Sequence, residues 1–411
     1  MSRVLVDSGI KWIGSLPNTW SITTVNKIFY RRKEVNDVEN PTVLSLARDG
    51  VKIRDISTNE GQLAESYDNY HKVYKDDLMI NPMDLISGAN CSMSEIEGVI
   101  SPAYINLASK ANIYPKYYDY FFKYQYWIKA MFAHGKGVSF NNRWTINWET
   151  MASYKLPYPK LSEQREISKF LDKKCLIIDK TINNNNKEIE LLEEYKVSII
   201  SNAIDSENKY NTKLKRHVTY IKGYAFNSIN FTKRGIPVVM VGNMKENTIT
   251  DVENYINEDA FYKKYLLLKD DLIISTVGSN PTVINSAVGK VSIIPERYNN
   301  SYLNQNMAKL IANDNLETKY LFYIFKTKRC REYLNLIAHG TANQSSINVA
   351  DILDYRLFFP PLEKQKNIIK KLDKQCSKLD EVINYRKQII EKLEEYKRSL
   401  IYECVTGKRE V

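Results

Sequence analysis

The sequence predicts an α+β protein in which two similar globular domains of mixed α and β structure are separated by two long helices. Three observations predict this fold class: an internal repeat, two helical stretches inside that repeat, and short β-branched runs in the regions that flank them. We expect the first globular domain at 1–155, the first helix at 156–205, the second globular domain at 206–356 and the second helix at 357–411.

The repeat appears when the sequence is aligned with itself at an offset of about 200 positions. Leu156–Ile204 then matches Leu357–Val405 without a gap, and about 22 of roughly 49 positions are identical. In each copy the predicted helix begins next to a proline, Pro159 in the first and Pro361 in the second, which a helix start tolerates, and no further proline or glycine follows before Gly407. The sequence therefore predicts one long helix in each copy.

A heptad pattern of mostly apolar side chains runs along both copies and predicts that the helices pair as a coiled coil. Polar residues interrupt the pattern at matching places, which favours a fixed register. The alternative is that each helix packs only on its own domain. The expected seam consists of Leu171, Ile178, Ile182, Ile189, Leu192 and Ile199 in the first helix, and Leu372, Leu379, Ile383, Ile390, Leu393 and Leu400 in the second.

The order of domain, helix, domain and helix favours an antiparallel pair. A helix of about 35–40 residues is about 55 Å long, and parallel pairing would require the second domain to bridge that length. Antiparallel pairing instead puts the end of one helix beside the start of the other. We therefore expect an antiparallel coiled coil as a spacer, with one domain at each end and approximate two-fold symmetry.

The two globular regions repeat more faintly. Lys75–Leu78 recurs as Lys269–Leu272, and the tripeptide Ala133–Gly135 recurs as Ala338–Gly340. Apolar and β-branched runs such as Ile236–Val241, bounded by Gly, Asn and Asp, are typical of strands joined by turns. We expect the two domains to share one mixed fold.

Composition narrows the class of protein. A chain of 411 residues can bury hydrophobic cores without disulfides or structural metal ions. Its formal net charge of +11 is compatible with binding a polyanion but does not establish it. Five cysteines without a C-x-x-C pair indicate neither a disulfide framework nor a zinc finger, and they favour a reducing compartment. Because the sequence shows no signal peptide and no run of about 20 apolar residues, we expect a soluble, cytoplasmic protein with no membrane contact.

Three passages of the sequence resemble type I restriction-modification specificity subunits, and they occur in the same order as in that family. These are Asp7–Gly14 followed by Leu16, Pro17 and Trp20; the segments leading into each long helix, Leu156–Gln164 and Leu357–Gln365; and the closing Ser399–Lys408. Gly223–Phe226 is similar to the start of many recognition domains of that family. Two positions depart from the family pattern: Pro157 and Pro159 are not adjacent, and Lys364 stands in place of a glutamate.

The resemblance implies a DNA sequence-specificity subunit that reads a bipartite, asymmetric target in double-stranded DNA, one half per target-recognition domain. It also implies two adenine methyltransferase (modification) subunits as partners, with restriction motor-nuclease subunits joining for cleavage. S-adenosylmethionine, ATP and Mg would bind those partners, so we expect no cofactor in this chain.

The residues themselves give no sign of catalysis. Asn81–Met83 lacks the second proline and the aromatic residue of an adenine methyltransferase motif, and Gly135–Gly137 lacks the spacing of a phosphate-binding loop. The four histidines show no metal-ligand spacing. We therefore predict no catalytic residue and no metal site. The alternatives are a stand-alone DNA-modifying enzyme, which the missing motifs disfavour, and a coiled-coil scaffold protein with incidental charge.

Base edges in the major groove are read by side chains that donate or accept hydrogen bonds. Such side chains follow both Ala-His-Gly tripeptides and differ between the domains, as separate half-site specificities require. The candidates there are Lys136, Ser139, Asn141, Asn142 and Arg143 in the first domain, and Thr341, Asn343, Gln344, Ser345 and Ser346 in the second. Further candidates are Arg48, Lys52 and Arg54, and Lys222, Tyr224, Lys233, Arg234, Ser279, Asn280 and Thr282. The alternative is a solvated polar loop, and basic members can contact phosphate alone.

Overall fold

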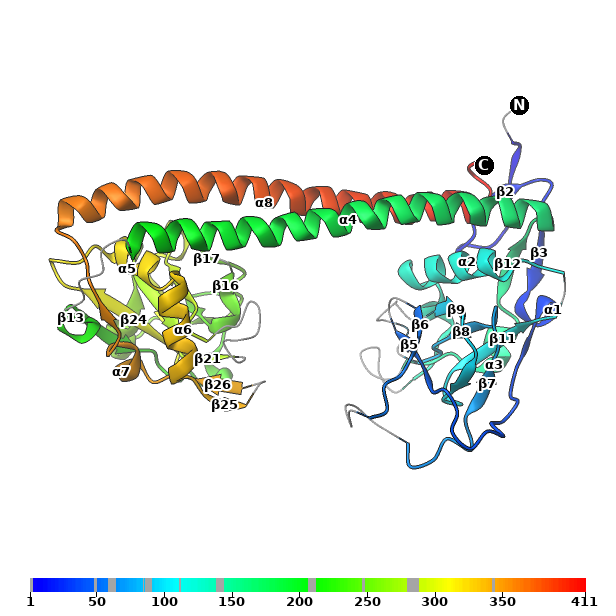
Figure 1. The fold of residues 1–411 in the computed structure, drawn as a ribbon, viewed down its shortest axis with the longest axis horizontal. Coiled ribbons are helices and arrows are strands. Elements are labelled where there is room, and N and C mark those ends of the chain that lie inside the picture. The colour runs from blue at the N-terminus through cyan, green and yellow to red at the C-terminus, as the bar shows by residue number, and fades with distance from the viewer. Residues whose placement is uncertain are drawn as a thin grey trace. The chain divides into compact units, whose positions relative to one another are not determined.

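The computed structural model of the chain describes residues 3–47, 50–57, 64–83, 85, 91–110, 112–137, 144–205, 212–245, 248–278, 288–341 and 344–411. These residues fold into two compact units (Figure 1). Unit 1 comprises Met1–Asn185 and Gln388–Val411, and unit 2 comprises Asn186–Lys387. Each unit combines sheets with helices, and two long helices run through the chain, so the predicted α+β fold class is confirmed.

Unit 1 is built on an antiparallel four-stranded sheet with the order β4-β11-β8-β9. Ile105 of β11 pairs with Ile80 of β8, and Leu107 pairs with Arg31 of β4. β8 is buried throughout because it is a central, entirely apolar strand. The elements are β1 (Leu5–Asp7), β2 (Ser15–Pro17), β3 (Ser21–Thr24), α1 (Val25–Ile28), β4 (Phe29–Arg31), β5 (Leu44–Ala47), β6 (Gly50–Ile53), β7 (His71–Val73), β8 (Leu78–Ile80), β9 (Cys91–Met93), β10 (Gly98–Ile100), β11 (Ile105–Ser109), α2 (Pro115–Trp127), η1 (Met131–His134), α3 (Trp148–Ala152) and β12 (Lys155–Tyr158).

Unit 2 contains a four-stranded antiparallel sheet of the same design, with the order β14-β24-β20-β22. Leu310 of β24 pairs with Tyr220 of β14 and with Leu272 of β20. The elements are β13 (Thr212–Lys213), η2 (Leu214–Arg216), β14 (Val218–Lys222), η3 (Ser228–Asn230), β15 (Ile236–Val239), η4 (Val241–Asn243), β16 (Met244–Lys245), β17 (Thr248–Ile249), β18 (Tyr255–Ile256), η5 (Ala260–Tyr265), β19 (Leu266–Leu267), β20 (Leu272–Ser275), β21 (Val277–Gly278), β22 (Val291–Ile293), η6 (Glu296–Tyr298), β23 (Ser301–Leu303), β24 (Met307–Ala312), α5 (Thr318–Ile324), α6 (Lys328–Ile337), β25 (His339–Thr341), β26 (Gln344–Ser346), α7 (Val349–Ile352) and β27 (Arg356–Leu357).

The long helices are α4 (Leu161–Ile204) and α8 (Leu362–Val405), each of 44 residues. Within unit 1, the start of α4 lies beside the end of α8, where Lys397 binds Asp179 at 2.6 Å. Within unit 2, the end of α4 lies beside the start of α8, where Lys196 binds Asp380. In each unit the two helices are therefore antiparallel. Of the expected seam residues, Leu171, Ile178, Leu372, Ile383 and Leu400 are buried, and the other seven are partly buried.

Matched contacts attach each globular part to its long helix. Tyr120 of α2 donates a hydrogen bond to Asp172 at 2.6 Å, and Tyr323 of α5 donates one to Asp373 at 2.6 Å. Gln164 accepts a hydrogen bond from the backbone N–H of Tyr114, and Gln365 accepts the corresponding bond in unit 2. Each unit thus has a short helix, α2 or α5, between its sheet and the long helices (Figure 1).

In the part of the chain that the structure describes, no helix combines the length and the apolar character needed to cross a membrane.

Candidate nucleic-acid interface

In unit 2, a small three-stranded sheet with the order β21-β26-β25 carries the polar segment that follows Ala338–Gly340. Gly278 of β21 and Gly340 of β25 both pair with Ser345 of β26. The backbone N–H of Ile347 donates to the carbonyl of Thr276 at 2.9 Å, which fixes this sheet to the end of β20. Val277–Gly278 and His339–Thr341, which are far apart in sequence, therefore belong to one small sheet.

Unit 1 contains the corresponding pairing. Lys136 and Thr145 exchange backbone hydrogen bonds of 2.7 and 2.9 Å, just after Ala133–Gly135. The segment that follows β8 lies beside this pair, because the Ile146 N–H donates to the Pro82 carbonyl at 2.9 Å. In unit 1 the chain after β8 thus lies beside the chain after the Ala-His-Gly tripeptide, and in unit 2 the chain after β20 does the same.

The structure places the predicted residues of these segments unevenly. Lys136 and Ser346 are exposed, whereas Ser345 is buried with 1% of its surface accessible. Of the two serines, Ser346 is therefore the one that is accessible for contact with DNA. Strand alternation explains the difference, because successive side chains of β26 face opposite sides. Thr341 and Gln344 are described only as the paired backbone ends of β25 and β26. Nine candidates lie outside the described residues: Arg48, Ser139, Asn141, Asn142, Arg143, Ser279, Asn280, Thr282 and Asn343.

Arg54 lines a polar groove of about 350 Å³ in unit 1, next to the β5–β6 hairpin. The groove also contains Tyr70, Tyr104 and Met83, the last from the segment that follows β8. Burial raises the pKa of Tyr104, and the nearby Arg54 charge partly offsets that rise. The structure therefore brings Arg54 close to Met83, in the segment that follows β8, whereas Lys52 is exposed on β6.

In unit 2, Lys222 ends β14 and is exposed. Lys222 pairs with Ala308 of β24, and the neighbouring Met307 pairs with Ser275 at the end of β20. Lys222 therefore lies at the end of the sheet where the chain leaves β20 toward β21. Lys233 and Arg234 are exposed before β15.

Tyr224 is partly buried in an aromatic cluster. Its ring lies 5.1 Å from those of Phe226 and Tyr262 and 5.2 Å from Tyr265. These contacts give Tyr224 a packing role that the sequence did not indicate.

Sequence reasoning missed a basic cluster in unit 1. Arg31 ends β4, Lys33 follows it and is exposed, and His71 starts β7. Burial lowers the pKa of His71, and the positive charges of Arg31 and Lys33 lower it further. The consecutive cations Arg31, Arg32 and Lys33 were the available signal.

Arg32 has a different role from its neighbours. It binds the buried carboxylate of Asp77 at 2.9 Å and stacks over the Tyr74 ring. Burial opposes ionisation of Arg32, yet Asp77 raises its pKa overall.

No group of three or more His, Cys, Asp or Glu side chains suited to a metal ion is found among the described residues. All five cysteines are free and buried. Burial raises the pKa of the Cys91 thiol far above its usual value, which keeps it protonated and unreactive.

Two units of one fold, each presenting paired polar segments at one edge of its sheet, define a two-domain recognition protein. A family model for the type I restriction modification DNA specificity domain matches residues 96–194 and 196–395. The chain therefore belongs to this family and is a type I restriction-modification specificity subunit. That membership gives it a recognition role within a multi-subunit complex.

Individual relatives agree with this assignment. The chain is 20% identical to the EcoBI specificity subunit of Escherichia coli, over 99% of this chain and 90% of that protein. It is 25% identical to the putative MjaX specificity subunit of Methanocaldococcus jannaschii, over 65% of this chain and 62% of that protein. That second alignment spans less than two thirds of the relative.

A solved chain from a type I restriction-modification system, studied for complex assembly and conformational transition, has the same fold. Its TM-score is 0.68 at 13% sequence identity, over 95% of this chain and 98% of the other.

Proposed function

We propose that this chain reads a bipartite, asymmetric DNA target, with one half of the target read by each unit. The proposal rests on a pairing that occurs in both units at one end of the sheet. There the chain after β8 or β20 lies beside the chain after the Ala-His-Gly tripeptide, and the side chains differ between the two units. Unit 1 pairs Lys136 with Thr145 where the β25–β26 hairpin of unit 2 pairs Thr341 with Gln344. One scaffold with two sets of contacting residues is what two unlike half-sites require.

Exposed cations in both units support binding to the phosphate backbone. Lys136 and Lys33 in unit 1, and Lys222, Lys233 and Arg234 in unit 2, are all exposed. Phosphate contacts fix the position of a protein on DNA and carry no sequence information. We assign positioning to Lys33, Lys222, Lys233 and Arg234, and base reading to the side chains of the paired segments, Lys136 among them.

We further propose that the chain has no enzymatic activity of its own and acts in the cytoplasm. Two adenine methyltransferase subunits would be its partners for modification, and motor-nuclease subunits would join for cleavage. S-adenosylmethionine, ATP and Mg would bind those partners. This proposal rests on the family membership and on the absence of methyltransferase and phosphate-loop motifs from the sequence.

The test combines the full chain with the modification subunits proposed as its partners. Genomic DNA lacking adenine methylation is incubated with S-adenosylmethionine, and methylated adenines are mapped by sequencing. We expect methylation at one two-part motif with the complex and none with the chain alone. Methyl transfer by the chain alone would instead support a stand-alone modifying enzyme, and a complex without any sequence-specific methylation would support a scaffold protein.

A further inference from the structure

An exposed phenylalanine stands on a packed aromatic cluster in unit 2. Phe261 lies in η5, and 64% of its surface is accessible. Its ring centre is 5.7 Å from that of Tyr224 and 5.3 Å from that of Tyr262. Both tyrosines pack in turn on Phe226, at 5.1 and 5.0 Å. One side of the Phe261 ring is therefore supported by other aromatic rings, while the rest of the ring is accessible.

The backbone of η5 also holds Phe261 in place. The carboxylate of Asp259 accepts a hydrogen bond of 2.8 Å from the Phe261 N–H. The carbonyl of Asp259 accepts a second hydrogen bond, of 3.0 Å, from the Tyr262 N–H. Phe261 is therefore presented at a defined position by its backbone as well as by its ring.

The fold does not require an exposed ring at this position. Counting back from the repeated Lys75–Leu78 and Lys269–Leu272, Phe261 corresponds to Tyr67 of unit 1. Tyr67 is only partly exposed, and its ring packs on that of Tyr70 at 5.1 Å. The exposure of Phe261 is thus a property of unit 2, and a large exposed aromatic side chain on a rigid support indicates a contact surface.

The aromatic cluster lies at the end of the sheet that carries the β25–β26 hairpin, to which we assign base reading. The N–H of Gly223, the residue before the first tyrosine of the cluster, donates to the Met307 carbonyl at 3.0 Å. The carbonyl of the preceding residue, Asn306, accepts a hydrogen bond of 2.9 Å from the Thr276 N–H, and Thr276 accepts one from Ile347, which follows β26. A short run of backbone hydrogen bonds therefore connects the cluster to the hairpin.

Two cations follow Phe261 in the same short helix. Lys263 and Lys264 are both exposed, and Lys264 Nζ lies 4.8 Å from the centre of the Tyr265 ring. Aromatic side chains that enter DNA stack on the bases, while neighbouring cations bind the phosphates. An exposed phenylalanine followed by two lysines has the chemistry for both contacts.

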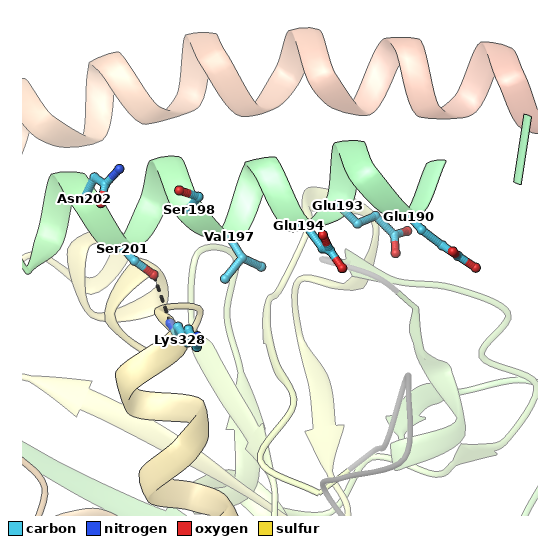
Figure 2. Close-up of a pocket in the computed structure, with 8 residues that line it drawn as sticks. All are labelled: Glu190, Glu193, Glu194, Val197, Ser198, Ser201, Asn202 and Lys328. Carbon is cyan, nitrogen blue, oxygen red and sulfur yellow. Dashed lines mark hydrogen bonds between the residues drawn. The ribbon is translucent and has the colours of Figure 1, made fainter. Parts of the chain in front are cut away.

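The surface of α4 in this unit carries the opposite charge. Figure 2 shows Glu190, Glu193 and Glu194 on α4, where they line a groove of unit 2 together with Lys328. Carboxylates repel the phosphates of DNA. Charge therefore favours the approach of DNA to η5 and disfavours its approach to this part of α4.

We propose that Phe261 inserts between neighbouring base pairs of the DNA bound by unit 2 and kinks the duplex there. Lys263 and Lys264 hold the phosphates beside the kink. The inference rests on the proposed function, which brings DNA to this end of the sheet. It adds a contact that distorts the duplex to the contacts that read base edges, so the affinity for a target depends on how easily its sequence bends.

The test uses the full chain assembled with the modification subunits and a short duplex that carries the two-part motif. A fluorescence donor and acceptor at the two ends of the duplex report its bend, and titration reports the affinity. We expect Phe261→Ala to reduce the bend by about 20° or more and to weaken binding about tenfold. Phe261→Trp should restore both, which excludes loss of the fold as the cause. The control Ile311→Ala changes an exposed side chain at the other end of β24 and should leave both unchanged.

Salt dependence separates stacking from charge. Phe261→Ala should weaken binding by the same factor at every salt concentration. Lys263→Ala and Lys264→Ala should each lower the slope of log binding constant against log salt by about 1.

Three results would overturn the inference. Phe261→Ala could bind DNA within about twofold of wild type, or it could bind weakly and still bend the duplex as wild type does. Weaker assembly of Phe261→Ala with the modification subunits in the absence of DNA would instead place Phe261 in a protein interface.

The failure of the inference is distinguishable from the failure of the proposed function. If the wild-type complex methylates a two-part motif and Phe261→Ala bends and binds that motif as wild type does, only the inference fails. If the wild-type complex shows no sequence-specific methylation, the proposed function fails and the inference fails with it.

Discussion

Replacing Lys123 by methionine should destabilise unit 1 by about 3 kcal/mol, because it leaves the buried carboxylate of Asp119 without its nearest cation. Asp119 is 1% exposed and Lys123 is 30% exposed, with 2.8 Å between Lys123 Nζ and Asp119 Oδ2. Asp119 also accepts a hydrogen bond from the backbone N–H of Met93 in β9, so it ties α2 to the central sheet. Removal of one partner from such a pair typically costs about 3–5 kcal/mol, and the remaining contacts of Asp119 favour the lower value.

The pH dependence of this contribution has a definite sign. Burial alone would lower the pKa of Lys123, but the charge of Asp119 outweighs it and the pKa is raised. A raised lysine pKa gives stability that is fully present below the unfolded-state pKa of about 10.4 and is lost as pH rises through the higher folded-state value. We therefore expect the effect of Lys123→Met to be constant between pH 7 and about pH 9.

Tryptophan fluorescence isolates unit 1 in this measurement. All five tryptophans lie in that unit, at Trp12, Trp20, Trp127, Trp144 and Trp148. With a urea m-value of about 2 kcal/mol/M, a loss of 3 kcal/mol lowers the midpoint by about 1.5 M.

Two further variants complete a double-mutant cycle and a control. The double variant Lys123→Met with Asp119→Asn removes both charges of the pair. Its loss of stability should be at least about 1 kcal/mol smaller than the sum of the losses of the two single variants. Lys116→Met removes a cation 3.7 Å from Asp119 and should cost less than about 1 kcal/mol. A midpoint for Lys123→Met within about 0.3 M of wild type would refute this reasoning.

Three other predictions concern unit 2 and DNA. Burial lowers the pKa of Lys326 to about 7, so the unfolded state binds more protons than the folded state between pH 7 and pH 10. The free energy of unfolding of unit 2 should therefore rise by about 2 kcal/mol from pH 7 to pH 9. Circular dichroism during urea unfolding should show that rise in wild type and not in Lys326→Met. Gly223→Ala would place a Cβ 1.9 Å from the Asn304 carbonyl oxygen, so proteolysis should show unit 2 unfolded while the tryptophan transition of unit 1 persists. Lys233→Ala and Arg234→Ala should each lower the slope of log binding constant against log salt by about 1, and an unchanged slope would mean that neither contacts phosphate.

The long helices could be predicted from the sequence because their determinants are local. Neither copy contains a glycine or proline to interrupt the helix, and the repeat supplies the pattern twice. The strand orders could not be predicted in the same way. β8 pairs with β11 about 25 residues later, and β15 pairs with β23 in parallel about 60 residues later. Such pairings depend on tertiary packing.

The candidate interface shows the same division. The Ala-His-Gly tripeptides mark two segments of the predicted interface, but the sequence did not indicate that the chain after β8 would lie beside the first of them. His71 and Arg31 are about 40 residues apart, so their proximity was hidden as well. The burial of Ser345 beside exposed Ser346 was within reach, because strand alternation alone predicts it once β26 is assigned.

The central claim is that each unit reads one half of the DNA target, and exchange of one domain tests it most directly. Residues 1–155 are replaced by the corresponding residues of a specificity subunit with a different target, and the hybrid is expressed with its modification subunits. Methylated adenines are then mapped across the genome. We predict a two-part motif in which one half has changed and the other half is that of the parent chain. A motif with both halves altered, or a single undivided motif, would contradict the account.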